Sequence, residues 1–280
     1  PGMKLIVMSD MHRGDGSGAD DFAKNSLIYR CALKHYLEEG FTYIELGDAE
    51  ELWENDNFDQ IYITHTPVYD LLANFHDPDP AKTRYIKVWG NHDLYWKDHQ
   101  DIYQSLFPEM QIYEAVILND SILMIHGHQA DPMCSGPVAA VSQFFVNHIW
   151  ADLQRGGIKD PTRAATNPGL CNEVDERLHR WATKNNRGIT AIFAGHTHRA
   201  VFENLSLTEM RLEAINFTAE KAVHFQERRD SRYYNTGSCV HPMSITGLEI
   251  SFDDQIRSNL IEWLCATEAN MLTVKRLALR

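Results

Sequence analysis

The sequence predicts a layered α/β protein, and three observations support this fold class. Short apolar runs typical of buried strands alternate with segments whose apolar residues recur at every third or fourth position, as on one face of a helix. Polar residues follow the apolar runs directly. The chain has 280 residues, of which 44% are hydrophobic and 23% charged, enough for one large domain or a domain with an insertion. Alternating strands and helices are typical of a sheet covered by helices.

The first part of the chain supplies the strands and helices of this predicted sheet. The expected strands lie at 3–9, 41–47 and 84–90. The expected helices lie at 21–39 and 58–76. Pro67 lacks a backbone N–H, so we expect the second helix to bend or break there.

The next segments complete the predicted core. Residues 112–118 and 121–127 flank Asn119 and Asp120, a pattern that predicts a hairpin, and 188–195 predicts a further core strand. Strand-like segments also occur in the last third of the chain, at 211–217, 245–252 and 259–266, and they predict a second sheet.

Residues 131–187 fit neither pattern. Segments 137–157 and 172–186 have helical spacing, and the loop 158–170 separates them. We therefore expect one domain over 3–280 that carries a helical insertion, or cap, at 131–187. The insertion directly follows the motif H-G-H, so it is expected to lie near the functional site.

The charge and cysteine content limit the function classes. The formal net charge is −13, which opposes sequence-independent binding to long nucleic acid but leaves room for a small phosphorylated substrate beside metal ions. The five cysteines form no C-x-x-C pair, which predicts reduced thiols. No apolar run reaches the length of a transmembrane helix and no signal peptide precedes the first strand, so we expect a cytoplasmic protein.

Ligand-type residues follow the predicted strands at their carboxyl ends. The clusters contain, in chain order, Asp10 and His12, then Asp48, then Asn91, His92 and Asp93, then His126 and His128, and finally His196 and His198. Ligands bind beyond the carboxyl ends of the strands in open α/β sheets. Each cluster alone is weak, since G-D is commonly a turn and H-x-H a surface pair. Several costly polar groups at one end of a sheet predict a metal site.

The ordered motifs D-x-H, G-D, G-N-H-D, H-G and G-H-x-H resemble those of the calcineurin-like metallophosphoesterase superfamily over residues 3–199. The segment 233–239, YYNTGSC, is similar to the usual downstream segment of that family. The resemblance implies a four-layer α/β/β/α sandwich of the metallo-dependent phosphatase type with a helical cap insertion. It also implies a site for two metal ions, with this set of ligands: Asp10, His12 and His198 for one ion, Asn91, His126 and His196 for the other, and Asp48 for both.

The resemblance also implies the chemistry. Oxygen and imidazole ligands without a thiolate suit Mn²⁺, Fe or Zn²⁺, with Mn²⁺ favoured. The implied activity is hydrolysis of a phosphodiester, pyrophosphate or phosphomonoester by a water that bridges the two ions. His92 is implied to donate a proton to the leaving-group oxygen. Asp93 either holds the other nitrogen of His92 or caps the following helix.

Three further side chains lie beside the predicted ligands. Arg13, His128 and Arg199 could bind the non-bridging oxygens of a phosphate, as arginine often does. The alternative is a surface salt bridge, which we favour for Arg199, whereas we favour a substrate contact for Arg13. Asn235 is expected to support the site as a hydrogen-bond donor.

The insertion resembles the lid of bacterial UDP-2,3-diacylglucosamine pyrophosphatases. Its apolar residues Phe144, Phe145, Ile149 and Trp150 could hold acyl chains, although packing of the insertion onto the sandwich is the simpler interpretation. The chain has His92 where that family usually has Arg, and H-G-H where H-G-D is typical. We therefore expect a related enzyme with a small or amphipathic phosphorylated substrate. A non-catalytic scaffold and a hydrolase with one metal ion are the alternatives. The intact ligand set with His92 argues against the scaffold, and Asp48 argues against the single ion.

Overall fold

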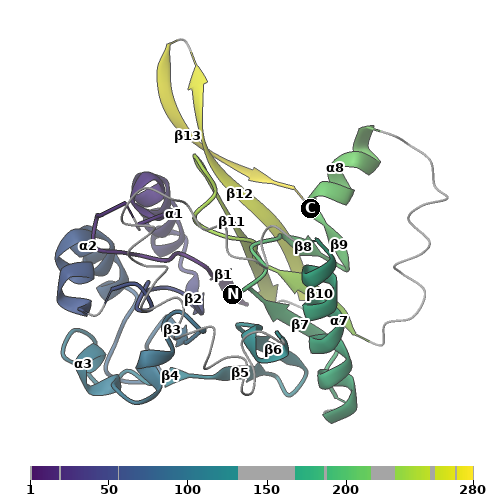
Figure 1. Ribbon diagram of the computed structural model, residues 1–280, viewed down its shortest axis with the longest axis horizontal. Helices are drawn as coiled ribbons and strands as arrows, with labels where there is room; N and C mark the ends of the chain where they lie inside the picture. Colours follow the sequence, from purple (N-terminus) through teal and green to yellow (C-terminus); the bar gives the residue numbers. More distant parts are fainter. Residues whose placement is uncertain are drawn as a thin grey trace.

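The structure is a computed structural model that describes residues 2–18, 20–55, 57–131, 168–185, 188–215, 231–252, 256–268 and 270–279. It is a mixed α/β fold built on two β-sheets, as the sequence predicts (Figure 1). Among the described residues, no helix is both long enough and apolar enough to cross a membrane.

The first sheet has seven strands in the order β13-β12-β11-β1-β2-β3-β4. Their bounds are β1 Met3–Met8, β2 Thr42–Leu46, β3 Tyr85–Val88, β4 Ile112–Tyr113, β11 Ser244–Phe252, β12 Ile256–Glu268 and β13 Met271–Ala278. Strands β1 to β4 are parallel, and β11, β12 and β13 extend the sheet from β1 in antiparallel pairs. The C-terminal strands therefore join the first sheet, whereas the sequence pattern predicted that they form a second one.

The second sheet has six strands in the order β5-β6-β7-β10-β8-β9. Their bounds are β5 Ala115–Leu118, β6 Ile122–Ile125, β7 Ala191–Ala194, β8 Val201–Phe202, β9 Leu205–Ser206 and β10 Arg232–Asn235. The predicted hairpin is present as the antiparallel pair β5 and β6, while β6, β7 and β10 are parallel neighbours. The carboxyl ends of β6 and β7 carry the histidine motifs.

Most of the helices cover the outer faces of the sheets. The described helices are α1 Ser26–Glu38, α2 Phe58–Ala73, α3 Gln100–Gln104, α7 Pro168–Asn185 and α8 Leu207–Ile215, with 3₁₀ turns at η1 Ala23–Asn25, η2 Leu94–Lys97 and η3 His128–Ala130. Helix α2 is kinked at His65, two residues before Pro67, as the proline predicts. The kink arises because Pro67 cannot donate a backbone hydrogen bond and because its ring clashes with the preceding turn of the helix.

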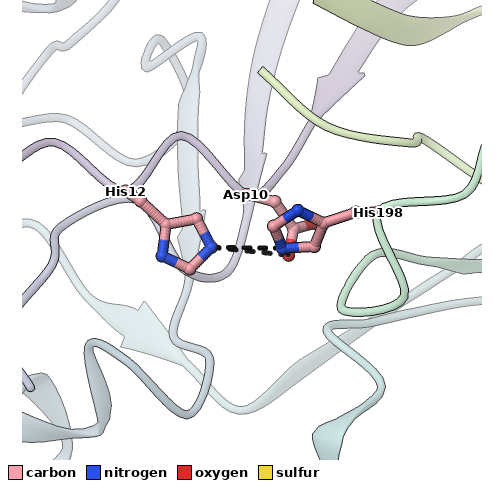
Figure 2. A group of neighbouring side chains, drawn as sticks. All are labelled: Asp10, His12 and His198. Carbon is pink, nitrogen blue, oxygen red and sulfur yellow. Dashed lines mark hydrogen bonds and ion pairs between the residues drawn. The ribbon is translucent and has the colours of Figure 1, made fainter. Parts of the chain in front are cut away.

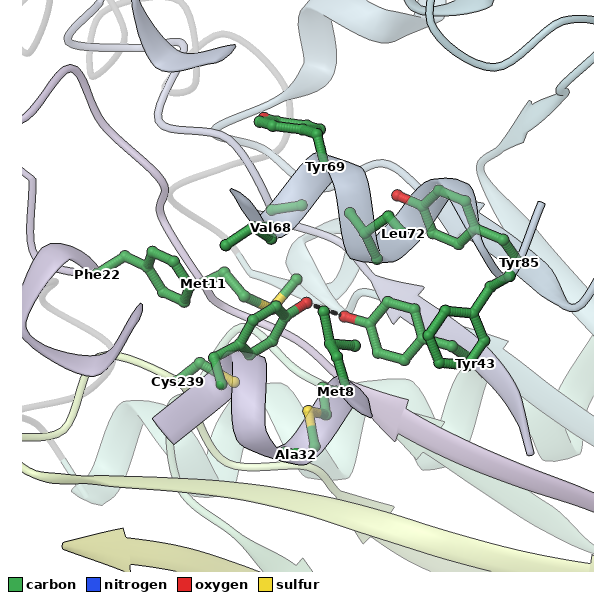
Figure 3. Packing of buried hydrophobic residues seen from close by; sticks show 14 of the residues in the cluster. Met8, Met11, Phe22, Ala32, Tyr43, Val68, Tyr69, Leu72, Tyr85 and Cys239 are labelled. Atoms are coloured by element: carbon green, nitrogen blue, oxygen red, sulfur yellow. Dashed lines mark hydrogen bonds between the residues drawn. The ribbon is translucent and has the colours of Figure 1, made fainter. Parts of the chain in front are cut away.

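Strand β1 shows how the layers are stacked. Alternate side chains of a strand point to opposite faces of the sheet. Ile6 and Met8 pack in a cluster with residues of α1 and α2, whereas Leu5 and Val7 pack against residues of the second sheet. Figure 3 shows the first of these clusters, in which Met8 lies between the helices and the strand residue Tyr43.

Helix α7 covers the other side of the second sheet. Its buried residues Val174 and Leu178 cluster with Leu123 of β6 and Ile192 of β7. The order across the molecule is thus helices, first sheet, second sheet and helix. The contact surfaces are mainly apolar, although the buried side chains of Glu45 and Lys87 lie on the face of the first sheet that meets the helices. Burial of each large aliphatic side chain stabilises the fold by about 1.5–3 kcal/mol.

Three sequence predictions need comment. The predicted strand 211–217 is wrong for 211–215, which belong to α8. The reason is a capping box, in which the backbone N–H of Ser206 donates to Glu209 Oε2 at 2.8 Å and the N–H of Glu209 donates to Ser206 Oγ at 3.3 Å. Helix α7 contains nearly all of the predicted helix 172–186 but begins at Pro168. The predicted helix 137–157 lies outside the described residues.

Candidate metal centre

The predicted ligands come from both sheets and meet at the carboxyl ends of their strands. Asp10 and His12 follow β1, Asp48 follows β2, Asn91 follows β3, His126 follows β6, and His196 and His198 follow β7. All seven side chains are buried. Parallel strands that end at the same edge of a layered fold bring these residues together although they are up to 188 positions apart in the chain, from Asp10 to His198.

Asp10, His12 and His198 form the first ligand group (Figure 2). Nε2 of His198 lies 3.1 Å from Asp10 Oδ1, and Nε2 of His12 lies 4.0 Å from the same oxygen. The two Nε2 atoms are 3.3 Å apart. Two imidazole nitrogens that face one carboxylate oxygen at this spacing form a donor set suited to one metal ion.

Asp48, His126 and His196 form the second ligand group, with ligand atoms within 4.8 Å of one another. Nε2 of His126 lies 3.1 Å from Asp48 Oδ2. The same oxygen lies 3.8 Å from Nε2 of His12, which belongs to the first group. Asp48 therefore faces both groups, and a third cluster of possible ligands contains His12, Asp48 and His92.

Asn91 provides a test of whether the residues fit a metal ion. Its side chain is buried, and its Oδ1 has no hydrogen-bond partner among the described residues. An unpaired buried oxygen is costly, by about 1–3 kcal/mol, unless a ligand satisfies it. Together with the carboxylates and imidazoles of the two groups, this oxygen fits a divalent cation that prefers oxygen and nitrogen ligands.

Backbone geometry sets the ligand residues apart from the rest of the chain. Among the described residues, twelve non-glycine positions have a positive φ, and five of these are predicted ligands: Asp10, His12, Asp48, His196 and His198, at 55°, 49°, 52°, 67° and 53°. Such backbone is unfavourable for residues with a Cβ and is concentrated at functional sites.

Two glycines leave room for the ligand side chains. A Cβ at Gly90 would clash with Oδ1 and the backbone nitrogen of Asp48. A Cβ at Gly195 would clash with Ser9 Oγ and Asp10 Oδ2. The glycines of the G-N-H-D and G-H-x-H motifs are therefore required by the close approach of ligand carboxylates.

Comparison with known proteins bears on the family. The profile described as calcineurin-like phosphoesterase matches residues 3–200. The chain belongs to this family. Together, the calcineurin-like phosphoesterase family and the candidate ligand groups support a metal-dependent phosphoesterase. No curated protein matches the chain.

Solved structures resemble this calcineurin-like phosphoesterase only distantly. A double mutant of Vps29 from Entamoeba histolytica has 12% identity and a TM-score of 0.40, over 99% of each chain. Wild-type Vps29 from the same organism, complexed with zinc, has 13% identity and a TM-score of 0.37, over 99% of this chain and 100% of that one. A protein provisionally named as a 5′-nucleotidase, from Staphylococcus aureus, has 13% identity and a TM-score of 0.38, over 92% of this chain and 53% of that one.

Carboxylates behind the histidines fix their orientation. Nδ1 of His12 and Nδ1 of His92 lie 2.7 Å and 2.8 Å from Glu51 Oε2, and Nε2 of His196 lies 2.8 Å from Asp131 Oδ2. Burial opposes ionisation of Glu51, but His92 and His12 lower its pKa to about 2. An ionised carboxylate accepts the N–H of each ring, which directs the opposite nitrogen toward the ligand groups. Sequence reasoning missed both Glu51 and Asp131.

His92 lies next to the first group without being one of its predicted ligands. Its ring is stacked on Trp53, with centroids 4.3 Å apart, and meets the His12 ring edge-on at 4.5 Å. Burial alone would lower the pKa of His92, but the Glu51 and Asp48 carboxylates outweigh it and raise the pKa to about 10. The ring is thus held in one plane, and the two carboxylates favour its protonated form.

Asp93 does not contact the ring of His92. Glu51 occupies that position, and Asp93 gives the following 3₁₀ turn no side-chain cap. Instead the Asp93 carboxylate accepts the backbone N–H groups of Asp48, Ala49 and Gly90, at 3.2, 2.9 and 2.5 Å. Neither sequence interpretation of Asp93 matches this arrangement, in which the carboxylate joins two ligand loops.

The side chain of Arg13 does not lie among the predicted metal ligands. Its side chain is fully buried, and its guanidinium pairs with Glu45 at 2.7 Å and Glu50 at 2.6 Å. The structure therefore does not support a substrate contact for Arg13. His12 has a left-handed backbone, with φ at 49°, and the chain turns there, so that the Arg13 side chain meets Glu45 and Glu50 while the His12 ring lies at the ligand groups.

The other two predicted substrate contacts lie nearer the site. His128 is buried beside His126 and Trp89, with ring centroids 5.6 Å and 5.4 Å away, and its Nδ1 has no partner among the described residues. Burial, and then the charge of His126, keep the pKa of His128 well below its usual range, so the ring is neutral. Arg199 pairs with Asp175 of α7 at 2.5 Å and donates to Asn172 at 2.8 Å, as the salt-bridge alternative predicts.

Asn235 supports the histidine loop of the second sheet. Its Nδ2 donates to the Gly195 carbonyl at 2.7 Å and to Thr197 Oγ1 at 3.2 Å. This matches its expected role as a hydrogen-bond donor. The apolar residues of the insertion that were considered as an acyl-chain site, Phe144, Phe145, Ile149 and Trp150, lie outside the described residues.

Proposed function

We propose that the protein is a phosphoesterase with two divalent metal ions that hydrolyses a phosphodiester, pyrophosphate or phosphomonoester bond. The observation that carries the proposal is the position of Asp48. Its Oδ2 lies 3.1 Å from Nε2 of His126 and 3.8 Å from Nε2 of His12. A carboxylate oxygen that faces histidines of both groups is suited to bridge two ions, whereas a single ion needs no bridge.

The proposed ligand sets follow the two groups. One ion is assigned to Asp10, His12 and His198, the other to Asn91, His126 and His196, and Asp48 to both. When bound, two divalent ions supply stabilisation of the phosphate oxygens and an activated nucleophile at neutral pH. Oxygen and imidazole donors favour Mn²⁺ in this proposal, with Fe or Zn²⁺ as the alternatives.

His92 is the proposed proton donor. Glu51 accepts the proton on Nδ1, so Nε2 is the nitrogen that faces a leaving group. An alkoxide leaves poorly without a proton, and a positioned acid accelerates such a step by about 10²–10⁴-fold. Stacking on Trp53 keeps the ring in the plane that this transfer requires. The charge of nearby metal ions would lower the pKa of His92 toward the operating pH.

The proposed substrate is a small phosphorylated molecule. The formal net charge of −13 opposes long nucleic acid, while neutral His128 beside the second group could donate a hydrogen bond to a phosphate oxygen. Arg199 is a weaker candidate because Asp175 and Asn172 already bind its guanidinium.

The four described cysteines are free thiols, which supports a reducing compartment such as the cytoplasm.

The test is hydrolysis by the Mn²⁺-loaded protein of three substrates: bis-p-nitrophenyl phosphate, p-nitrophenyl phosphate and a UDP-linked pyrophosphate. The matched control is Asp48→Asn, which keeps the size of the side chain and removes its charge. Turnover of any of the three that disappears in the control supports the proposal and identifies the bond type. Absence of turnover with Mn²⁺, Fe²⁺ and Zn²⁺, together with low metal content, would favour the scaffold alternative.

A further inference from the structure

A cluster of four charged side chains lies fully buried next to the ligand loops of the first sheet. We call Arg13, Glu45, Glu50 and Lys87 the buried charge cluster; none of them is exposed to solvent. Arg13 bridges the two carboxylates at 2.7 Å and 2.6 Å, and Lys87 Nζ bridges them at 2.9 Å and 2.8 Å. Two cations and two anions are therefore closed into a ring of ion pairs.

Such a ring is a poor source of stability. Removing ions from water costs several kcal/mol for each ion, and apolar replacements of similar volume are often equally stable or more so. The buried charge cluster therefore calls for a role other than stability. Its place in the chain indicates one, because Arg13 directly follows His12 and Glu50 is two residues after Asp48.

The two carboxylates of the cluster differ in what they connect. Glu45 lies on β2 and, besides the two cations, accepts the Tyr85 hydroxyl at 2.6 Å from the neighbouring strand β3. It also accepts the hydroxyl of Tyr29 from α1 at 3.3 Å, so that Arg13 is its contact with the ligand loops and its other contacts are with strands and a helix. Glu50 lies beyond the end of β2, in the loop that also contains Asp48.

Glu50 contacts each of the three ligand loops of the first sheet. It lies in the Asp48 loop, binds Arg13 from the Asp10–His12 loop, and accepts the Trp96 Nε1–H at 2.9 Å. Trp96 belongs to the 3₁₀ turn that follows Asn91 and His92. Backbone hydrogen bonds join the first two loops as well, from the Arg13 N–H to the Ala49 carbonyl at 3.0 Å and from the Glu51 N–H to the Arg13 carbonyl at 3.0 Å.

We propose that Glu50 is a positioning residue that holds the three ligand loops of the first sheet in the arrangement required for metal binding. This inference rests on the proposed metal centre but assigns Glu50 no contact with metal or substrate. The carboxylate acts through Arg13 and Trp96, which fix the loops that carry His12 and Asn91. Loss of the charge would weaken the links from the Asp48 loop to Arg13 and Trp96, while the backbone hydrogen bonds between the loops, the bonds of Asp93 and the strand pairing stay in place.

The experiment compares Glu50→Gln with Glu45→Gln. Both replacements keep the shape of the side chain and remove one buried negative charge from the same ring. Mn²⁺ affinity is measured by calorimetry and stability by urea unfolding. We expect similar losses of stability, but a loss of Mn²⁺ affinity of about 10-fold or more only in Glu50→Gln, as for other groups that orient ligands. Equal Mn²⁺ affinities in the two variants would overturn the proposal.

A second pair of variants decides the question if Glu50→Gln does not fold. Trp96→Phe keeps a buried aromatic ring and removes the N–H that Glu50 accepts. Trp263→Phe is the control, since its Nε1 donates to Tyr36 at 3.1 Å in the β12 region. We expect weaker Mn²⁺ binding in Trp96→Phe than in Trp263→Phe at matched stability. Identical Mn²⁺ binding by this pair would contradict the role of Glu50.

Wild-type measurements separate this proposal from the proposed function. If the wild-type protein binds no Mn²⁺, Fe²⁺ or Zn²⁺, the metal centre itself is wrong and the positioning role falls with it. If the wild-type protein binds metal and hydrolyses phosphoesters, but Glu50→Gln and Glu45→Gln bind metal alike, only the positioning role of Glu50 is wrong.

Discussion

The two halves of the metal centre are held in different ways. The ligand loops of the first sheet, after β1, β2 and β3, rest on ionised side chains, namely the buried charge cluster and the carboxylate of Asp93. In the second sheet, the backbone of the ligand loops after β6 and β7 rests on neutral hydrogen bonds, and a carboxylate, that of Asp131, holds the ring of His196. Asn235 binds the Gly195 carbonyl at 2.7 Å, and the Gly195 N–H donates to the His126 carbonyl at 2.8 Å.

The halves are joined where they meet. His126 of the second half lies with Nδ1 2.9 Å from the Leu46 carbonyl of β2, and the His196 N–H donates to Asp10 Oδ2 at 3.0 Å. One site can therefore combine ligand loops held by charged side chains with ligand loops whose backbone is held by neutral hydrogen bonds. Replacements that change charge should act mainly on the first half, and replacements that change space should act on both.

The largest effect is expected where the halves meet. Asp48→Ala removes the oxygen that faces His12 and His126, so we expect activity below detection and fewer bound metal ions per chain. Turnover of bis-p-nitrophenyl phosphate and metal content by mass spectrometry measure this. Normal turnover in Asp48→Ala would show that the two halves do not share a ligand.

The next effect concerns chemistry that lies only in the first half. His92→Asn is expected to retain the metal ions and to lower kcat for alkyl phosphoesters by about 10²–10⁴-fold. Nitrophenyl esters, whose leaving groups need no proton, should be affected less. Equal losses for the two substrate types would argue against proton donation by His92.

A steric change should affect both halves alike. Gly90 lies in the first half, and Gly90→Ala places a methyl group against Asp48 of that half and His126 of the second. Gly195 lies in the second half, and Gly195→Ala places one against Ser9 and Asp10 of the first. We expect each to destabilise the protein by about 1–3 kcal/mol or more in urea unfolding, as overpacking does. If the loss of unfolding free energy differed several-fold between the two variants, the backbone of one half would move aside more easily than that of the other.

The neutral hydrogen bonds that hold the loop after β7 can be tested directly. Asn235→Ala leaves the Gly195 carbonyl and Thr197 Oγ1 without their shared donor, and we expect a loss of about 1–3 kcal/mol in unfolding free energy. The loss should not depend on ionic strength, since no charge is removed. A strong salt dependence would show that the second half is also held by charge.

The smallest effect is expected at Arg199. Its side chain is 26% exposed and pairs with Asp175 of α7. We expect Arg199→Met to lower the unfolding free energy by about 1 kcal/mol, since Arg199 is partly exposed and its buried partner Asp175 keeps the Tyr233 hydroxyl as a donor, and to leave metal binding unchanged. A large increase in KM for phosphoesters would instead assign Arg199 to substrate binding.

The convergence of the proposed ligand residues could be predicted from the sequence because its signal is local. Each follows an apolar strand at its carboxyl end, and strand ends converge in a layered α/β fold. The contacts of Glu51 and Asp131 were missed because they depend on tertiary structure. A local signal exists for Glu51, which lies three residues after Asp48 in a run of acidic residues, but the run does not tell which carboxylate meets a histidine.

The direction in which a side chain points was harder to predict than the set of residues that lie near one another. Arg13 is adjacent to His12 in sequence, yet its side chain points into the buried charge cluster, because the left-handed backbone of His12 turns the chain there and the sequence pattern does not show this turn. The predicted strand 211–215 was wrong because the capping box of Ser206 and Glu209 outweighs the apolar pattern. The bend at Pro67 was predictable from covalent geometry alone.

The left-handed backbone of the ligand residues has a consequence for the balance between stability and function. Each such residue with a Cβ is unfavourable by about 1–3 kcal/mol, and a domain of this kind has a net stability of only about 5–15 kcal/mol. Five ligands with this backbone therefore represent a substantial fraction of that margin. Glycine at these positions would relieve the strain, so Asp48→Gly should be more stable than Asp48→Ala although both lack the ligand. A lineage of this protein that lost its activity would then be expected to drift toward glycine at the former ligand positions.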